Sequence, residues 1–253
     1  DGGFELFWKP HLGYGGSFEW RGDIRFEDEP SWNRFFTGYR LFLLHQARLA
    51  ARFGAELLAV GVELEGTTHR PEWHALIAEV RTIYSGRLTY AANWDRVEEV
   101  PFWSELDVIG VHAYFPLAPD EDPSDEALQR AWDGVLADLA ELSERNGGKP
   151  ILFAEIGYNR SLEAARQPWA YEMDESPAAR RLRRRLIALA IRRVENAPAI
   201  EGMFWWKWIP GPNHHDRDFS MKDPEARAVL AEMWGDSTRS TGSDPGRSTG
   251  GHP

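Results

Sequence analysis

Short apolar runs alternate with amphipathic helical patterns along most of this chain, and this alternation limits the possible folds more than any other feature. The runs are bounded by loop residues and rich in Val, Ile, Leu and Phe, as in strands buried on both faces of a parallel sheet. The predicted strands are 4–9, 57–62, 88–92, 108–113, 151–154 and 202–206. The predicted helices are 31–53, 71–84, 124–146, 176–196 and 224–234, with a short helical piece at 97–103. Six such units predict an α/β fold, either an open doubly wound sheet or an incomplete barrel.

Local signals support this division and exclude two common nucleotide sites. Ser31 is the expected N-cap of the first helix, and Gly54 marks its end. The glycine-rich stretch 13–16 opens no helix, so it predicts a loop rather than a dinucleotide site, and no phosphate-binding loop signature occurs. The arginine-rich run 180–185 is interleaved with leucines at helical spacing, which predicts a solvated helix face.

Composition excludes several functional classes. The chain has 253 residues, for which we expect one domain over 1–234 and a disordered polar tail over 235–253. The formal net charge of −11 argues against binding to nucleic acid or to an anionic membrane surface, because both require a basic face. No apolar stretch approaches the roughly 18–20 residues of a membrane span. The chain has no cysteines, so it has no disulfides and no thiolate metal sites.

Tryptophan is unusually frequent, with 12 residues in the chain. We expect about half of these rings to lie in the core, because large aromatic side chains dominate core packing. The others suit a sugar-binding surface, since a flat indole face packs on the C–H surface of a pyranose ring and retains a polar N–H.

Two of the predicted strands end in a glutamate. Glu63 follows the run 57–62, and Glu155 follows the run 151–154. The carboxyl ends of parallel strands form the rim where α/β active sites lie, so a pair of carboxylates there predicts general-acid and nucleophile chemistry. A single glutamate at such a position can also cap a helix or pair with an arginine, and Glu65 is an alternative to Glu63 as the acid.

Polar and aromatic residues occur at the end of every predicted strand. The residues predicted to bind substrate are Lys9, His11, Asn93, Trp94, His112, Tyr114, Trp206 and Trp208. Residues two apart share a strand face, so we expect Gly61 to share a face with Glu63, and Phe153 with Glu155. His214, His215 and Asp216 resemble a metal cluster, but adjacent histidines in a loop are weak evidence, and we predict neither a metal nor an organic cofactor.

Several of these stretches are similar to glycoside hydrolase family 113, the β-mannanases of a large clan of (β/α)8-barrel retaining glycosidases. The stretches that carry the resemblance are 9–11, 59–64, 88–94, 106–117, 149–158 and 202–208. The resemblance implies a (β/α)8 TIM barrel and a retaining hydrolase that cleaves β-1,4-linked polysaccharide, most simply β-mannan. It implies Glu63 as acid/base at the end of strand 4 and Glu155 as nucleophile at the end of strand 7.

The strand count agrees with that assignment, because three strand–helix units separate Glu63 from Glu155. By the same count the barrel is truncated at its N-terminus, with strands 3–8 present, so we expect a fragment or a chain completed by another chain. Val62 stands where many clan members have an asparagine that holds the sugar 2-hydroxyl. The alternatives are a non-catalytic glycosidase-like barrel that binds carbohydrate or has a structural role, and a metal-dependent hydrolase.

Overall fold

The computed structural model describes residues 3–13, 18–210 and 219–235. Its strands are β1 (Phe7–Trp8), β2 (Leu57–Val62), β3 (Arg87–Asn93), β4 (Val108–His112), β5 (Ile151–Ile156) and β6 (Ile200–Trp205). Its α-helices are α1 (Glu29–Phe53), α2 (Glu72–Arg81), α3 (Asp125–Arg145), α4 (Pro177–Glu195) and α5 (Pro224–Gly235). Short 3-10 helices are η1 (Arg21–Asp23), η2 (Glu65–Thr67), η3 (Val97–Glu99), η4 (Trp103–Glu105) and η5 (Leu162–Ala165).

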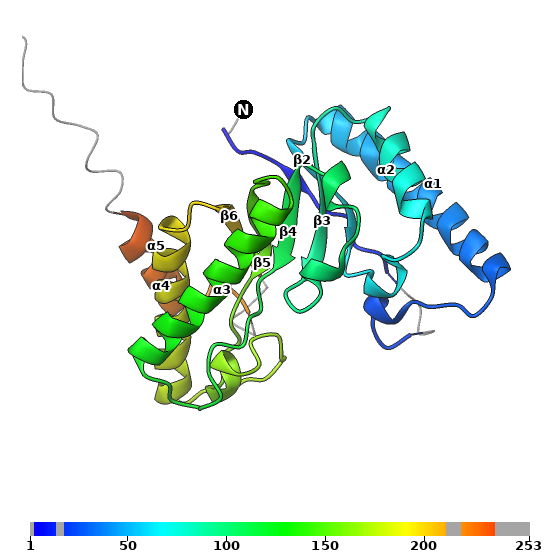
Figure 1. Cartoon of the computed structure of the whole chain (residues 1–253). Coiled ribbons are helices and arrows are strands. Elements are labelled where there is room, and N and C mark those ends of the chain that lie inside the picture. The colour runs from blue at the N-terminus through cyan, green and yellow to red at the C-terminus, as the bar shows by residue number, and fades with distance from the viewer. Residues whose placement is uncertain (1–2, 14–17, 211–218, 236–253) are drawn as a thin grey trace, which may run out of the picture.

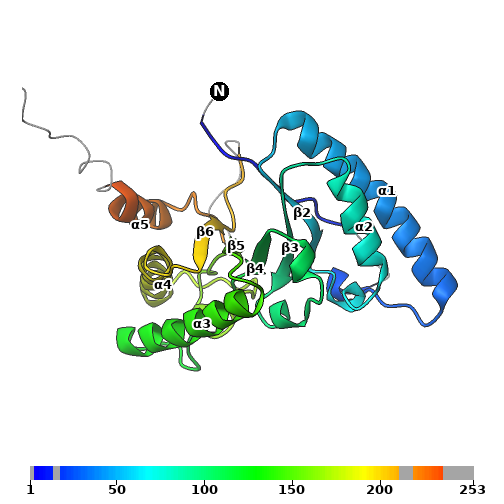
Figure 2. The same ribbon diagram turned by 45° about the horizontal axis from the view of Figure 1, so that its top comes forward.

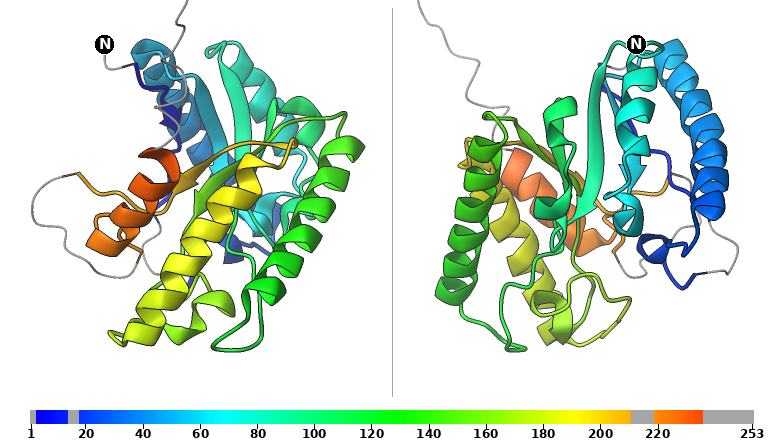
Figure 3. Two further views of the ribbon diagram at one scale, coloured as in Figure 1. Left: turned by 90° about the vertical axis from the view of Figure 1, so that its left-hand side faces the viewer. Right: turned by 45° about the vertical axis from the view of Figure 1, so that its right-hand side comes forward.

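The described strands form one parallel sheet in the order β1-β2-β3-β4-β5-β6, which follows the chain order. The sheet curls, and the helices form an arc on its outer side (Figures 1 and 2). Helices α1 and α2 pack together along one part of the arc, while α3 and α4 pack together along another (Figure 3). This arrangement is a half-barrel, which confirms the barrel alternative over the doubly wound sheet.

The two faces of the sheet differ because side chains alternate along each strand. Leu58 and Val60 of β2 belong to the large outer core between sheet and helices, whereas Ala59 belongs to a small inner cluster. The inner face carries Leu57, Ala59, Ala91, Val108, Leu152 and Ala154. Most of the apolar burial therefore lies between the sheet and its helices, which fixes the strands that carry the site.

The two edge strands contact each other through side chains. Phe7 of β1 and Phe204 of β6 pack with ring centroids 5.2 Å apart, and Phe7 also covers the inner clusters. Phe204 remains 42% exposed, so the inner face is open at this edge. The strand order places β1 and β6 at opposite edges, and this side-chain contact shows that the curl of the sheet brings the two edges together.

The two ends of α1 are capped by the expected kinds of residue, but the N-cap lies at a different position. Asp28, not Ser31, is the N-cap of α1: its carboxylate accepts a hydrogen bond from the Ser31 backbone N–H at 2.8 Å. Aspartate is as good a cap as serine, so the N-cap lies three residues earlier than expected. Gly54 ends α1 with φ of 67°, a left-handed conformation in which glycine has no Cβ penalty.

The arginine-rich stretch of α4 is only partly a solvated face. Arg183 is 4% exposed, and its guanidinium lies 3.0 Å from Asp223 Oδ2. Arg160 binds the same aspartate oxygen at 3.2 Å. A buried carboxylate needs such partners, so Asp223 draws Arg183 inward and the prediction of an exposed run is wrong at this residue.

Candidate functional site

Two β-bulges direct the glutamates toward the carboxyl end of the sheet. Strand β2 has one extra residue opposite β3 between Ala59 and Val62, and the ladder around β5 shifts register between Phe153 and Ile156. Bulges of this kind often turn a side chain toward an active site. They also break the period of two, so both predicted shared faces are wrong. Phe153 lies in the outer core, and a Cβ on Gly61 would meet the outer-core ring of Tyr90 at 2.7 Å.

Glu63 has an unusual backbone conformation. Its φ of 51° makes it the one non-glycine residue of the described part of the chain with a left-handed backbone, which costs a residue with a Cβ about 1–2 kcal/mol. Two hydrogen bonds hold it: the Glu63 N–H donates to Ala91 O at 2.9 Å, and the Leu64 N–H donates to Tyr90 Oη at 2.7 Å. A strained residue held in place this firmly points to a functional position.

The Glu63 carboxylate is surrounded by hydrogen-bond donors and positive charge. Its Oε1 lies 2.7 Å from His112 Nδ1, its Oε2 accepts a hydrogen bond from Trp20 Nε1 at 3.3 Å, and Arg21 Nε lies 3.9 Å from Oε2. Burial raises the pKa of Glu63, but the hydrogen bond and charge of His112, with Arg21 and Trp20, outweigh it and lower the pKa to about 2. Glu63 is therefore ionised in the substrate-free site.

His112 lies between the two glutamates and has no solvent exposure. Its Nδ1 contacts Glu63, while its Nε2 lies 3.4 Å from Glu155 Oε1 and 3.3 Å from Lys9 Nζ. One imidazole ring therefore separates the two carboxylates.

The Glu155 carboxylate is 8% exposed and is held by side chains that follow β1 and β4 in the chain. Lys9 pairs with Oε1, and Tyr114 donates a hydrogen bond to Oε2 at 2.9 Å. Burial raises the pKa of Glu155, but the charges of His112 and Lys9 outweigh it and leave the pKa below its usual value. The site therefore keeps this carboxylate ionised and oriented.

Glu65 is a third carboxyl at the same end of the sheet. Its Oε1 accepts a hydrogen bond from Asn93 Nδ2 at 2.8 Å, but its Oε2 is buried with no hydrogen-bond partner. A Cβ on Gly22 would lie 2.2 Å from that oxygen, so the glycine provides the space for it. Burial raises the pKa of Glu65 to about 7, and the negative charges of Glu63 and Asp95 add to the effect although Asn93 opposes it.

The raised pKa of Glu65 predicts a pH-dependent stability. The fold favours the neutral carboxyl, so this stabilisation is complete below the ordinary pKa of 4.5 and is lost as the pH rises through about 7. We expect Glu65→Gln, which remains neutral, to lose less unfolding free energy than the wild type between about pH 5 and about pH 8. Urea denaturation at both pH values measures this difference. Glu79→Gln on the surface of α2 is the control, and equal slopes for Glu65→Gln and wild type would contradict the prediction.

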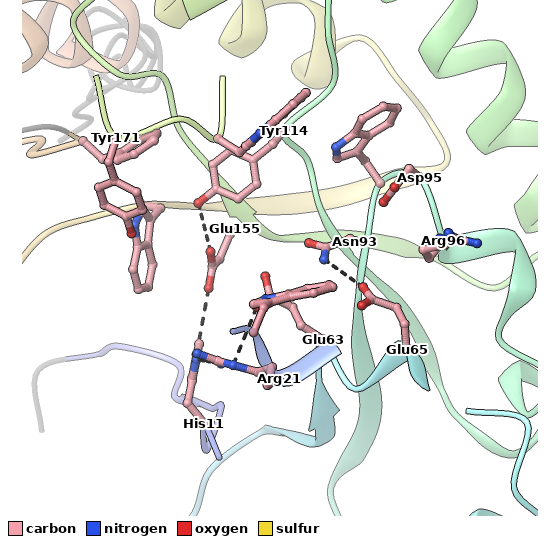
Figure 4. Close-up of a pocket in the computed structure, with 15 residues that line it drawn as sticks. His11, Arg21, Glu63, Glu65, Asn93, Asp95, Arg96, Tyr114, Glu155 and Tyr171 are labelled. Atoms are coloured by element: carbon pink, nitrogen blue, oxygen red, sulfur yellow. Dashed lines mark hydrogen bonds and ion pairs between the residues drawn. The ribbon is translucent and has the colours of Figure 1, made fainter. Parts of the chain in front are cut away.

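A cavity of about 750 Å³ opens above these carboxyls. Figure 4 shows Glu155 and Glu63 near its centre, with His11 and Tyr171 on one side and Asp95 and Arg96 on the other. This volume falls within the range of pockets that bind small molecules. The predicted residues that line the cavity are His11, Glu63, Asn93, Trp94, Tyr114, Glu155 and Trp206.

The other three predicted residues lie elsewhere. Lys9 lies against Glu155, and His112 is fully buried between the glutamates, so neither lines the cavity surface. Trp208 is 54% exposed and does not line this cavity. The Trp94 ring contacts Phe115 and Trp169, whereas the Trp206 ring lies against His11.

Loops supply several lining residues that the sequence interpretation missed. They are Trp20, Arg21, Arg96, Trp169, Tyr171 and Phe219. Trp20 and Arg21 lie at η1, within a loop that packs against η2 and so reaches Glu63. The aromatic residues in these otherwise polar loops could have predicted this contribution. A ring without apolar neighbours in the sequence is a candidate for an exposed binding surface.

Metal binding has no support in the part of the chain that the structure describes. No group of three or more metal-ligating side chains occurs among those residues, and His214, His215 and Asp216 lie outside them.

No described helix is long and apolar enough to cross a membrane.

The chain is similar to solved glycoside hydrolases. A GH113 β-1,4-mannanase, solved as a complex, has a TM-score of 0.75 and 23% identity, with 91% of this chain and 74% of that chain covered. The GH113 β-mannanase of Alicyclobacillus acidocaldarius, in complex with ManMIm, has a TM-score of 0.68 and 29% identity, with coverages of 84% and 69%. A Ruminococcus gnavus β-glucuronidase has a TM-score of 0.56 and 10% identity, with coverages of 83% and 37%. No curated protein sequence matches the chain.

The fold and the family agree. The six parallel strands and their helices match a (β/α)8 barrel truncated at its N-terminus, with strands 3–8 present, as the strand count predicts. The family model for Glycoside Hydrolase Family 113 matches residues 2–223, which is most of the chain. The resemblance found in the sequence is thereby confirmed: this chain belongs to glycoside hydrolase family 113.

Proposed function

We propose that this glycoside hydrolase cleaves β-1,4-linked mannan by a retaining double displacement, with Glu155 as nucleophile and Glu63 as acid/base. The observation that carries the proposal is the pair of carboxylates on either side of His112, at the floor of a cavity suited to sugar rings. Retaining glycosidases need two carboxyl groups close together, roughly 5–5.5 Å apart, because one of them attacks the anomeric carbon directly. The mannan substrate is suggested by the two GH113 mannanases with the same fold.

Glu155 suits the role of nucleophile because it is ionised, buried and fixed. Lys9 and Tyr114 hold its two oxygens, so the carboxylate loses little freedom when it attacks. One Glu155 oxygen forms a bond to the anomeric carbon as the bond to the leaving oxygen breaks. Water later attacks that carbon from the opposite face and releases the Glu155 carboxylate, so the β configuration is restored.

Glu63 must be protonated when the leaving oxygen departs. A bound sugar excludes water, and desolvation favours the neutral form of the Glu63 carboxyl over the carboxylate. The proton of the Glu63 carboxyl then moves to the leaving oxygen as the glycosidic bond breaks. In the second step Glu63 removes a proton from the attacking water.

The remaining lining residues suit sugar binding. Trp206 offers an indole face beside Glu155, with His11 stacked at 6.3 Å. His11, Asn93 and Arg21 are placed to hydrogen-bond hydroxyl groups at the cavity surface. Val62 is 2% exposed and packs in the inner cluster, so the 2-hydroxyl must be held by one of these polar groups instead.

Product analysis tests the function. We expect hydrolysis of β-1,4-mannan oligosaccharides, with the β-anomer as the first product by proton NMR, because two inversions restore the starting configuration. Cellulose- and chitosan-derived oligosaccharides serve as comparison substrates. An α-anomer as first product would contradict the double displacement, and hydrolysis of the glucan alone would contradict the mannan assignment.

A further inference from the structure

A second aromatic surface lies at the end of the cavity away from Trp206. Trp94 and Trp169 stack there, with ring centroids 5.9 Å apart and planes inclined by 25°. Trp94 directly follows Asn93, which binds Glu65, so the pair lies on the acid side of the cavity. Asp95 and Arg96 mark this end in Figure 4, opposite His11 and Tyr171, with the two glutamates between them. The mechanism proposed above does not use this surface.

The core supports this stack from behind. Phe115 is 8% exposed and contacts Trp94 with ring centroids 6.0 Å apart. Phe115 in turn packs against Phe153 and Trp132, which are fully buried. Trp94 is therefore wedged between the core and Trp169. The Trp169 side chain is 43% exposed, so a large apolar face remains open to the cavity.

A buried asparagine holds Trp169 in place. Asn159 has no solvent exposure, and its Nδ2 donates hydrogen bonds to Gln167 O at 3.1 Å and Ala170 O at 2.8 Å. These two carbonyls lie on either side of Trp169 in the chain. Ser161 Oγ donates to Asn159 Oδ1 at 2.6 Å and so orients the amide. An exposed indole presented by a turn that is fixed from within is a preformed binding surface rather than a loosely held loop residue.

We propose that the Trp94–Trp169 stack binds a pyranose ring of the leaving chain, on the aglycone side of the cleaved bond. This inference rests on the proposed function, because the general acid protonates the leaving oxygen and the leaving sugar therefore lies on the Glu63 side. The open face of Trp169 packs against the C–H surface of that sugar. Asp95 lines the same end of the cavity and accepts hydrogen bonds from its hydroxyl groups. Sugar platforms on both sides of the glutamates suit cleavage within an oligosaccharide chain.

Two substrates separate binding of the leaving sugar from the chemical step. Mannopentaose places sugars on both sides of the cleaved bond, whereas β-mannobiosyl fluoride has no sugar in its leaving group. We expect Trp169→Ala to lower kcat/KM for mannopentaose by about tenfold, the loss of one aromatic contact, and to leave kcat/KM for the fluoride unchanged. Trp169→Tyr keeps a flat ring and recovers part of the loss. Trp234→Ala removes another exposed tryptophan, on α5, and is the matched control.

Equal losses on both substrates would show that Trp169 only shapes the cavity, and no loss on mannopentaose would show that it binds no sugar. Either result overturns the inference. Calorimetry measures the binding of mannopentaose without requiring turnover. It therefore distinguishes failure of the Trp94–Trp169 inference from failure of the proposed function. If the wild type cleaves neither substrate, the proposed function fails, but mannopentaose binding that weakens about tenfold in Trp169→Ala still supports the platform. Unchanged affinity in that variant, or no binding to the wild type, overturns it.

Discussion

Replacing Glu155 with alanine is expected to abolish hydrolysis of β-1,4-mannan oligosaccharides, with a loss in kcat on the order of 10⁵–10⁶-fold. The variant lacks the carboxylate that Lys9 and Tyr114 position, so no covalent intermediate forms. Azide is small enough to enter the vacated space and attack the anomeric carbon of a mannoside with a dinitrophenyl leaving group. We expect the product to be the α-mannosyl azide, because a single displacement inverts the configuration. Kinetics with and without azide, and NMR of the product, measure both effects.

Two further variants separate chemistry from folding. Glu155→Ala leaves Lys9 buried without its carboxylate, which is destabilising, by about 3–5 kcal/mol in comparable buried pairs. Glu155→Gln retains the shape and one carbonyl oxygen that can accept the Lys9 hydrogen bond, so it should fold more stably than the alanine variant and remain equally inactive. Glu79→Ala removes a surface carboxylate on α2 and should keep full activity, since exposed ion pairs contribute little. Near-normal turnover in folded Glu155→Gln would refute the nucleophile assignment.

Replacing Glu63 with alanine is expected to lower kcat/KM by roughly 10²–10⁴-fold for mannan oligosaccharides, the usual contribution of a general acid. The loss should be much smaller for a dinitrophenyl mannoside, because that leaving group departs without a proton. Its turnover should then be limited by the second step, in which no base activates water. Added azide should accelerate that step and give the β-mannosyl azide, since two displacements retain the configuration.

Glu65 provides the matched control for Glu63, because both carboxyls lie within one short segment and face the same cavity. Glu65→Gln keeps a neutral side chain that accepts the Asn93 hydrogen bond. We expect it to retain the wild-type ratio of activities on the two kinds of substrate, even if binding weakens. The opposite result is a loss of activity that depends on the leaving group in Glu65→Gln but not in Glu63→Ala. It would assign the role of general acid to Glu65 instead of Glu63. The pKa of Glu65 is raised by burial to about 7, as suits a general acid, so this comparison distinguishes the two candidates.

The strands and helices were predictable because local signals are strong for each, and the family was indicated by the resemblance of several stretches. Apolar runs such as Leu57–Val62 and Ile151–Ile156 are bounded by loop residues and buried on both faces, so the strands from β2 to β6 were found to within two residues at each end. The predicted strand 4–9 is wrong in length, because β1 spans only Phe7–Trp8. The first cap was placed three residues late because Asp28 and Ser31 are equally good caps, and sequence does not rank them. Helix α2 ends at Arg81, earlier than the expected boundary, as helix ends often do.

Side-chain direction at the site was less predictable. The period of two placed Gly61 beneath Glu63, but a bulge in β2 and the left-handed backbone at Glu63 turn the glutamate toward the cavity and Gly61 toward the helices. A bulge is set by the fit between neighbouring strands, so no pattern within one strand reveals it. The position of Trp169 depends in the same way on a turn held by the side chain of Asn159.

The sequence by itself determined that two glutamates stand at the ends of parallel strands, because strand, helix and cap signals are properties of neighbouring residues. The barrel was implied only by the resemblance of several stretches to glycoside hydrolase family 113. Only the tertiary structure decided what surrounds those glutamates: Lys9 pairs with a carboxylate 146 positions away, and His112 lies between two residues from different strands. Ionisation depends on burial and on charges brought together across the fold. For this reason Glu63, the general-acid candidate, has a pKa of about 2 in the substrate-free site although its carboxyl is largely buried.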